Sequence, residues 1–223
     1  MDTSAQSPGP GGHSRSRDEY ARLARIYDPL TAPFLDRIRR YTAERVRRAG
    51  CERVLDICCG TGRQCLFLHQ AGINAVGVDR SAAMIDVART GTPASVACLR
   101  QDAAKLGFAD HVFHGAIICL ALHEKPEGTR QAIVREAVRV LVPGGLLLLI
   151  DFAPPRGAVG RTLRLGLSLV ERLVGREHYA NFRSYTIQGG LAGMTSGLPL
   201  CLIGGEVRFL AGNIQFAVLS ASA

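Results

Sequence analysis

Hydrophobic residues occur along this chain in short runs that alternate with longer segments of helical periodicity. Runs of five or six residues, several of them β-branched, are typical of strands buried in a sheet that is covered on both faces. The clearest runs are residues 53–57, 74–79, 95–100, 115–120 and 146–150. Because strands alternate with helical segments, we predict an α/β fold with a doubly wound, mostly parallel sheet and helices on both faces.

The longest helical pattern lies between the fourth and fifth predicted strands. From Glu127 to Leu141, apolar residues recur at the spacing of one helix face, at Ile133, Val134, Ala137, Val138 and Leu141. The sequence Val-Pro-Gly-Gly at residues 142–145 then predicts the end of this helix. Towards the end of the chain, residues 199–203 and 213–219 predict an antiparallel pair of closing strands.

The most informative passage joins the first predicted strand to a glycine-rich turn. The strand carries Asp56, and Gly60 and Gly62 follow in a turn that leads into a helix at about Arg63. Glycine lets the backbone approach a ligand closely, and a helix N-terminus favours an anion such as a carboxylate. The second strand ends at Asp79, where an acid accepts ribose hydroxyls in nucleotide-binding sheets. These features predict a site for an adenosine-containing cofactor.

The residues of the turn also narrow the choice of cofactor. A dinucleotide fingerprint has a third glycine three residues after the second, and Cys65 occupies that position here. Asp56 would repel a pyrophosphate but attract an ammonium group. An acid, a glycine turn and a second acid therefore favour a cationic amino-acid nucleoside.

The passage resembles motif I of the class I S-adenosylmethionine-dependent methyltransferases. The usual form of this motif is Leu-Asp-x-Gly-x-Gly-x-Gly, and Cys58 replaces its first glycine here. The sequence Leu-x-Pro-Gly-Gly-x-Leu-Leu-Leu-x-Asp at residues 141–151 resembles the fifth-strand region of the same family, so the likeness extends over residues 50–153. Residues 20–28 are similar to the segment before the core of ubiquinone/menaquinone-biosynthesis methyltransferases, which folds over the cofactor.

This resemblance implies S-adenosylmethionine as cofactor and a seven-stranded Rossmann-like sheet with an antiparallel last strand. The implied cofactor-binding residues are Asp56, Gly60, Thr61 and Gly62 for the loop and the methionine part, Asp79 for the ribose, Asp102 and Ala103 for the adenine, and Cys119, through its backbone, near the methionine part.

A single domain accommodates this organisation, because 223 residues suffice for one sizeable core. We expect residues 1–17, rich in Ser, Pro and Gly, to form a disordered tail. The remaining chain, 18–223, divides into N-terminal helices (18–50), a cofactor-binding core (51–153), a substrate cap (154–190) and closing strands (191–223).

The substrate cap contains an unusually wide apolar arc. It covers roughly 200° of a helical wheel and consists of Leu163, Leu165, Leu167, Leu169, Val170, Leu173 and Val174. Three interpretations stay open: a helix wedged between sheet and cap, a lid over an apolar acceptor, or a face that contacts a membrane or a second subunit.

The candidate catalytic residues follow the fourth predicted strand. His123 is the best candidate for a general base, because its pKa suits neutral pH and its place is beside the expected methyl donor. Glu124 would orient His123 or act alone; His178 in the cap is a second candidate, and a packing role for His123 is the alternative. The Asn/Asp-Pro-Pro-Tyr/Phe element of many amide and base-amine methyltransferases is missing after this strand.

The net charge of +8 is carried almost entirely by arginine, since Lys105 and Lys125 are the only lysines. A solvated helix face is one interpretation of the arginine clusters, and peripheral contact with an anionic membrane or an acidic substrate is another. No nucleic-acid-binding module is evident, so no nucleic acid is expected. The seven cysteines lack metal spacing, so we expect buried thiols, no metal and a cytoplasmic location.

The leading hypothesis is therefore a methyltransferase that acts on a small, apolar acceptor such as a quinone precursor, a lipid or another small metabolite, as a monomer or homodimer. Two alternatives stay open. One is a methyltransferase-like subunit that binds ligands without catalysis, and the other is a nicotinamide-dependent oxidoreductase, which Asp56 and the missing third glycine disfavour.

Overall fold

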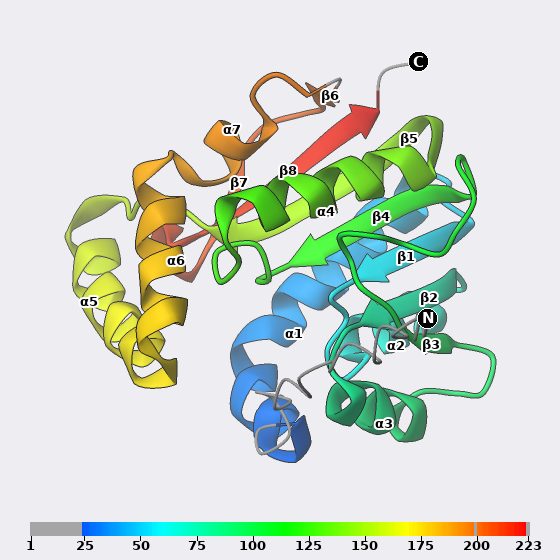
Figure 1. The fold of residues 1–223 in the computed structure, drawn as a ribbon, viewed down its shortest axis with the longest axis horizontal. Coiled ribbons are helices and arrows are strands. Elements are labelled where there is room, and N and C mark those ends of the chain that lie inside the picture. The colour runs from blue at the N-terminus through cyan, green and yellow to red at the C-terminus, as the bar shows by residue number, and fades with distance from the viewer. Residues whose placement is uncertain (1–23, 199, 222–223) are drawn as a thin grey trace, which may run out of the picture.

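A mixed eight-stranded sheet forms the centre of the computed structural model, which describes residues 24–198 and 200–221. The predicted disordered tail, 1–17, lies outside these ranges. Strand order is β3-β2-β1-β4-β5-β8-β6, with β7 also paired to β8 (Figure 1). The strands are β1 (Arg53–Ile57), β2 (Asn74–Asp79), β3 (Ala97–Arg100), β4 (Phe113–Cys119), β5 (Leu141–Phe152), β6 (Leu200–Leu202), β7 (Val207–Phe209) and β8 (Ile214–Ala221).

The predicted α/β fold with a mostly parallel sheet is confirmed. Strands β1 to β5 pair in parallel, and β8 runs antiparallel to β5. We expected seven strands, and the described residues contain eight. The difference lies at one edge, where β6 pairs with residues 219–221 of β8 and β7 pairs with residues 214–216. The edge beside β8 is therefore divided into two strands of three residues each.

Helices cover both faces of the sheet. Figure 1 shows α4 in front of the sheet and α1 behind it, with α5 and α6 side by side beyond the ends towards which β1 and β4 point. None of the described helices has the length and hydrophobicity needed to cross a bilayer. The helical elements are α1 (Ala24–Arg48), α2 (Arg63–Gln70), α3 (Ala82–Gly91), α4 (Glu127–Val140), α5 (Gly157–Val174), α6 (Arg176–Ile187), α7 (Gly190–Thr195) and the short 3-10 helix η1 (Leu210–Gly212).

The predicted α4 helix is confirmed, but the segment after it forms part of a strand. Strand β5 begins at Leu141, immediately after the helix, and the register against β4 shifts within the Pro-Gly-Gly sequence. Gly144 has φ 76°, a conformation that glycine adopts without steric cost. The segment thus forms an irregularity at the start of β5, and the apolar run 146–150 continues as the buried part of the strand.

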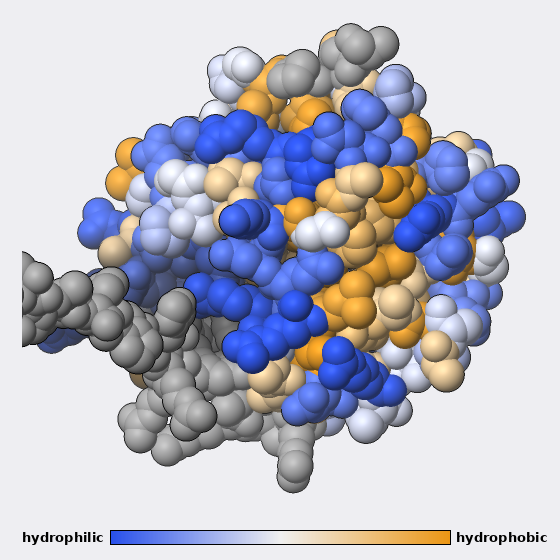
Figure 2. Space-filling model, turned by 45° about the vertical axis from the view of Figure 1, so that its right-hand side comes forward, coloured by the Kyte–Doolittle hydropathy of each residue, from blue (hydrophilic) through white to orange (hydrophobic). Residues whose placement is uncertain are grey.

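The surface mixes hydrophilic and hydrophobic side chains. On the face shown in Figure 2, hydrophilic residues lie on both sides of a band of hydrophobic ones. Exposed apolar residues are normal on folded proteins, so their presence alone does not identify a contact surface.

The glycine-rich loop contains one strained residue. Cys58, which replaces the first glycine of the motif, has φ 60°, a left-handed conformation that side chains with a Cβ adopt at a cost of about 1–2 kcal/mol. Gly60 and Gly62 share this conformation, with φ 55° and 74°, at no such cost. The loop therefore keeps the backbone path of a glycine at position 58 despite the substitution.

This strain predicts the order of stability of two variants. Cys58→Gly should be more stable than Cys58→Ala by about 0.5–1 kcal/mol, because relief of the left-handed penalty exceeds the entropy that glycine adds to the unfolded chain. Urea unfolding of both variants measures this difference. At Cys119, whose φ is not positive, the same pair should show the opposite order. Equal or greater stability of Cys58→Ala would contradict the strain.

Candidate active site

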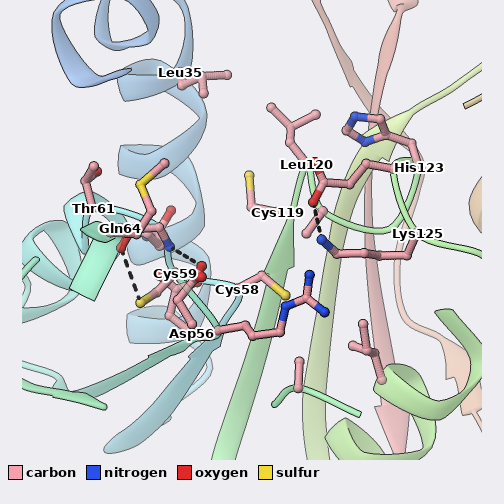
Figure 3. A pocket seen from close by; sticks show the side chains of 18 of the residues that line it. Leu35, Asp56, Cys58, Cys59, Thr61, Gln64, Cys119, Leu120, His123 and Lys125 are labelled. Carbon is pink, nitrogen blue, oxygen red and sulfur yellow. Dashed lines mark hydrogen bonds and ion pairs between the residues drawn. The ribbon is translucent and has the colours of Figure 1, made fainter. Parts of the chain in front are cut away.

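A cavity of about 310 Å³ opens at the carboxyl ends of β1, β2 and β4. Figure 3 shows side chains from two sides of it, with Leu35 and Thr61 opposite Leu120, His123 and Lys125. All the residues predicted as site residues line this cavity except Gly62: Asp56, Gly60, Thr61, Asp79, Asp102, Ala103, Cys119, His123 and Glu124. The structure therefore brings together residues from four separate segments of the chain.

The glycine-rich loop is held to the second strand by one carboxylate. Asp79 accepts a hydrogen bond from the Gly60 backbone N–H at 2.9 Å and another from the Ser81 N–H at 2.9 Å. Gly62 instead contacts α3, where a Cβ would come within 2.9 Å of the Ala88 Cβ. Gly62 thus allows close packing of the loop and α3, and Asp79 lies at the cavity wall with both oxygens oriented.

Asp56 is a buried acid, and few neighbouring groups stabilise the negative charge of its carboxylate. Its exposed fraction is 2%, and its hydrogen-bond partner among the described residues is the Cys65 thiol, 3.5 Å from Oδ2. Burial raises the pKa of Asp56 to about 7, against the lowering effects of Cys65 and the more distant Arg39. Within the described chain no cation forms an ion pair with this carboxyl. A positively charged ligand group in the cavity would supply that missing charge.

The first helix also contacts the loop. Thr61 Oγ1 donates to Asp28 Oδ1 at 2.8 Å, and Leu35 and Arg39 of the same helix line the cavity. Residues 20–28 are similar in sequence to a segment that folds over the cofactor in ubiquinone/menaquinone-biosynthesis methyltransferases. The described part of this segment, residues 24–28, forms the start of α1 and lies beside the glycine loop.

The loop after β3 forms another part of the wall. Asp102 is exposed and its Oδ1 accepts the Ala104 backbone N–H at 2.9 Å, whereas Ala103 is buried. Met84 of α3 and Arg80 line the same region. An apolar thioether beside a carboxylate suits a flat heteroaromatic ring with an exocyclic amine.

Asp151, at the end of β5, organises the opposite end of the cavity. Its carboxylate is completely buried and accepts three backbone N–H groups, from Leu122 at 2.9 Å, His123 at 3.2 Å and Phe152 at 2.7 Å. The fourth contact joins Asp151 Oδ1 to His123 Nδ1 at 2.7 Å. The carboxylate therefore determines both the path of the loop after β4 and the orientation of the imidazole.

The environment of His123 stabilises its charged form. Burial by itself lowers the pKa of His123, but the carboxylates of Asp151, Glu171 and Glu124 outweigh that effect and raise the pKa above its ordinary value. His123 Nε2 lies 3.8 Å from Glu171 Oε2 on α5. The imidazole thus has a carboxylate near each of its two nitrogens.

The cap extends this polar network. Glu171 Oε2 is 2.5 Å from His178 Nε2, and His178 Nδ1 is 3.8 Å from Glu124 Oε2. Glu124 also forms an ion pair with Lys125. The ligand atoms of His123, Glu171 and His178 lie within 4.8 Å of one another, the type of donor set that holds zinc. Because direct contacts already engage Glu171 with His178 and Asp151 with His123, we interpret the cluster as a hydrogen-bonded network.

Arg130 of α4 attaches the cap to the core. Its side chain is buried, and it donates to the backbone oxygen of Lys125 at 2.6 Å, to that of Asn181 at 2.8 Å and to Gln188 Oε1 at 2.9 Å. Asn181 in turn donates to the backbone oxygen of Glu124 at 2.9 Å. These bonds hold α6 against the loop that carries His123.

Two important acids escaped the sequence-based prediction. Asp151 ends the fifth apolar run, at the same edge of the sheet as Asp56 and Asp79, and this shared position is a signal that would have identified it. Glu171 lies in an arginine- and leucine-rich helix, and no local pattern shows that it faces the cavity. His178, the weaker histidine candidate, lies in the network beside it.

Known proteins share the core sequence. A family model described as a methyltransferase domain matches residues 54–145. An uncharacterised methyltransferase of Synechocystis sp. is 35% identical over 106 residues, which cover 47% of this chain and 49% of that protein. The demethylmenaquinone methyltransferase of Thermus thermophilus is 32% identical over 140 residues, which cover 60% of this chain and 63% of that protein. The chain thus spans about half to three fifths of the length of these curated relatives.

Solved structures share the fold. An O-methyltransferase family protein from Burkholderia thailandensis has a TM-score of 0.69 and 17% identity, covering 91% of this chain and 60% of that one. Magnesium protoporphyrin IX methyltransferase from Synechocystis PCC 6803, solved with bound SAH, has a TM-score of 0.62 and 18% identity, covering 96% and 90%. Residues 54–145 therefore match a methyltransferase domain, and the strand order and the solved structures agree with the Rossmann-like fold of class I S-adenosylmethionine-dependent methyltransferases.

Proposed function

We propose that this chain transfers a methyl group from S-adenosylmethionine to a small, largely apolar acceptor such as a quinone precursor, a lipid or another small metabolite. The observation that carries the proposal is one continuous cavity lined both by the nearly uncompensated acid Asp56 and by His123, whose ring Asp151 holds. The relatives named demethylmenaquinone methyltransferase favour a quinone-like acceptor.

The residues of the cavity suit this cofactor. The buried carboxyl of Asp56 matches the ammonium of the methionine part, and the backbone of Cys119 borders that region. Asp79, already oriented by Gly60 and Ser81, retains lone pairs for ribose hydroxyls. Asp102 and Ala103 then serve the adenine. Bound there, the cofactor supplies an electrophilic methyl group on a sulfonium ion.

The protein contributes position and proton transfer. Loop and cap residues hold the acceptor beside the methyl donor and exclude water, and positioning of this kind supplies a large part of the rate. Asp151 holds His123 through Nδ1, so the Nε2 lone pair of the neutral ring is available to take a proton from the acceptor. Glu124 lines the same end of the cavity and supports the charged form of His123.

A labelling experiment distinguishes the proposed methyltransferase from the two alternative functions, an inactive binding subunit and a nicotinamide-dependent oxidoreductase. Purified protein is incubated with S-adenosylmethionine labelled in its methyl group, together with an extract of membrane lipids or reduced short-chain demethylmenaquinone. The proposal expects label in a small apolar product. Cofactor binding without any label transfer would indicate the catalytically inactive binding subunit, and turnover that depends on a nicotinamide would indicate the oxidoreductase.

Cofactor affinity should depend on the protonation of Asp56. Below its pKa of about 7 the carboxyl is neutral and no longer attracts an ammonium, so affinity for S-adenosylmethionine should fall between about pH 7 and pH 5.5, approaching tenfold per pH unit. The α-amino group of the ligand stays protonated in this range, since such groups titrate at about 7.7–8.0. Isothermal titration calorimetry measures the effect.

Two controls isolate the Asp56 contribution. Adenosine, which has no ammonium, should bind with little change over the same pH range, and Asp56→Asn should remove the pH dependence for S-adenosylmethionine. Asp79→Ala should weaken both ligands, because it removes the ribose acceptor and releases Gly60. An affinity that is flat with pH in the wild-type protein would refute the assigned role of Asp56.

Removal of the imidazole should affect turnover and leave cofactor binding in place. His123→Ala should lower kcat by roughly 10² to 10⁴, the usual contribution of general acid–base catalysis, with the affinity for S-adenosylmethionine nearly unchanged. His69→Ala, an exposed histidine on α2, serves as the matched control and should retain full activity. Near-normal turnover in His123→Ala would show that catalysis rests on positioning alone.

The raised pKa of His123 predicts a shape for the pH–rate profile. A general base works in its neutral form, so kcat/KM should fall as the pH drops through a value above the ordinary 6.5 of histidine. Glu171→Gln removes a negative charge 3.8 Å from Nε2 and should move this fall to lower pH. Glu177→Gln, exposed on α6, should leave it unchanged. The other titratable groups around the ring, retained in both variants, are Asp151, Glu124, His178 and Tyr185.

A shift of equal size in both glutamate variants, or none in Glu171→Gln, would contradict the role of His123 as the titrating base.

A further inference from the structure

The outward side of α5 consists largely of exposed apolar residues, which we call the outer face of α5. Their exposed fractions are high: Val159 74%, Leu163 38%, Leu165 73%, Leu169 57% and Leu173 79%. At 100° per residue these positions share one side of the helix. The side chains of Val170 and Val174 lie outside the described set. Because Leu165, Leu169 and Leu173 face solvent, a helix wedged between sheet and cap does not explain the apolar arc.

The opposite side of α5 points into the protein and carries polar side chains beside Leu167, which packs against the core. Glu171 is buried and meets His123 and His178 at the cavity. Arg164 lies over the ring of Phe182, 4.5 Å from its centroid, and over that of Phe152 at 5.4 Å. A surface helix of a water-soluble domain normally buries its apolar side. In α5 most of the described apolar side chains face outward instead, which indicates a second apolar environment on the outside.

Exposed basic residues lie on α5, beside its outer face, and on the neighbouring helix α6. The segment 157–187 contains five arginines and two glutamates. Within the described part of the chain, none of the exposed arginines of this segment takes part in an ion pair. These arginines are Arg161 and Arg172 on α5, and Arg176 and Arg183 on α6. The surface thus combines exposed leucines with positive charge that acids of the chain leave uncompensated.

We propose that the outer face of α5 docks on an anionic membrane surface. Leucines inserted at the boundary between headgroups and acyl chains, together with arginines at the headgroups, are the two components of interfacial helix binding. A twofold contact with a second copy of the chain fits less well. It would bring Arg161 and Arg172 of one subunit close to the same arginines of the other, with few acidic residues to balance the positive charge. The positive charge beside the outer face of α5 therefore favours anionic lipid over a second copy of the chain.

Docking in this orientation places the cavity close to the lipid. Glu171, on the inner side of the same helix, lines the cavity, so one helix diameter of about 10 Å separates bilayer and acceptor site. This consequence rests on the proposed methyltransferase function, because it supplies an apolar acceptor directly from the membrane. The docking itself requires neither cofactor nor acceptor.

Vesicle flotation tests the docking. The purified chain is mixed with vesicles of equal parts phosphatidylcholine and phosphatidylglycerol, or of phosphatidylcholine alone. We expect binding to the anionic vesicles that weakens with salt, and little binding to the neutral ones. The double variant Leu165→Asp/Leu169→Asp should bind at least tenfold more weakly. Leu202→Asp, at an equally exposed leucine on β6, should bind like the wild type.

A second variant keeps the test decisive if the aspartate variant does not fold, as judged by circular dichroism. Arg161→Gln/Arg172→Gln leaves the apolar residues in place and should weaken binding to anionic vesicles by roughly fivefold for each arginine removed.

Three results would overturn the proposal: no binding of the wild type to anionic vesicles, equal binding to neutral vesicles, or equal loss in Leu202→Asp. A dimer that Leu165→Asp/Leu169→Asp dissociates, seen by analytical ultracentrifugation without vesicle binding, would assign the outer face of α5 to a second copy. Since no assay here uses S-adenosylmethionine, these outcomes are independent of whether the chain transfers methyl groups.

Discussion

The carboxylate of Asp151 is the interaction on which the arrangement around His123 depends. A completely buried charge is costly unless hydrogen bonds surround it, and this one accepts three backbone N–H groups and one imidazole nitrogen. These contacts join the end of β5 to the loop after β4. They set the direction of His123 and, through the same loop, the position of Glu124 and Lys125 against the cap. Loss of this carboxylate would leave several buried donors without an acceptor.

The parallel sheet determines where the acids of the cavity lie. Parallel strands end at a common edge, so acids that are far apart in sequence, Asp56, Asp79 and Asp151, come together there. Asp79 and Asp151 have the same structural role in two different loops. Each carboxylate accepts hydrogen bonds from backbone N–H groups of a loop and so holds that loop in place. Asp79 and Asp56 line the cavity themselves, whereas Asp151 acts from behind the wall by holding His123.

Most of the core, and most of the residues that line the cavity at the ends of β1 and β2, could be predicted from the sequence, because apolar runs, glycines and strand-terminal acids are local signals. Strand β6 lies within the predicted strand 199–203, whereas β7, with three residues, is too short for its periodicity to indicate a strand. The part of the cavity around His123 was harder to predict for a different reason. A helical wheel shows that α5 has two unlike sides but not which side faces inward, and here the polar side does. Glu171 therefore became visible as a site residue only in the folded chain, where α5 and α6 meet the loop that carries His123.

The orientation of His123 can be measured directly by long-range ¹⁵N–¹H correlation spectroscopy of protein labelled with ¹⁵N-histidine. If Asp151 holds the ring as described, the neutral imidazole carries its proton on Nδ1, Nε2 is unprotonated, and Asp151→Asn disturbs this signal selectively. A neutral ring protonated on Nε2 would contradict it, because the nitrogen that faces the cavity would then have no lone pair with which to accept a proton.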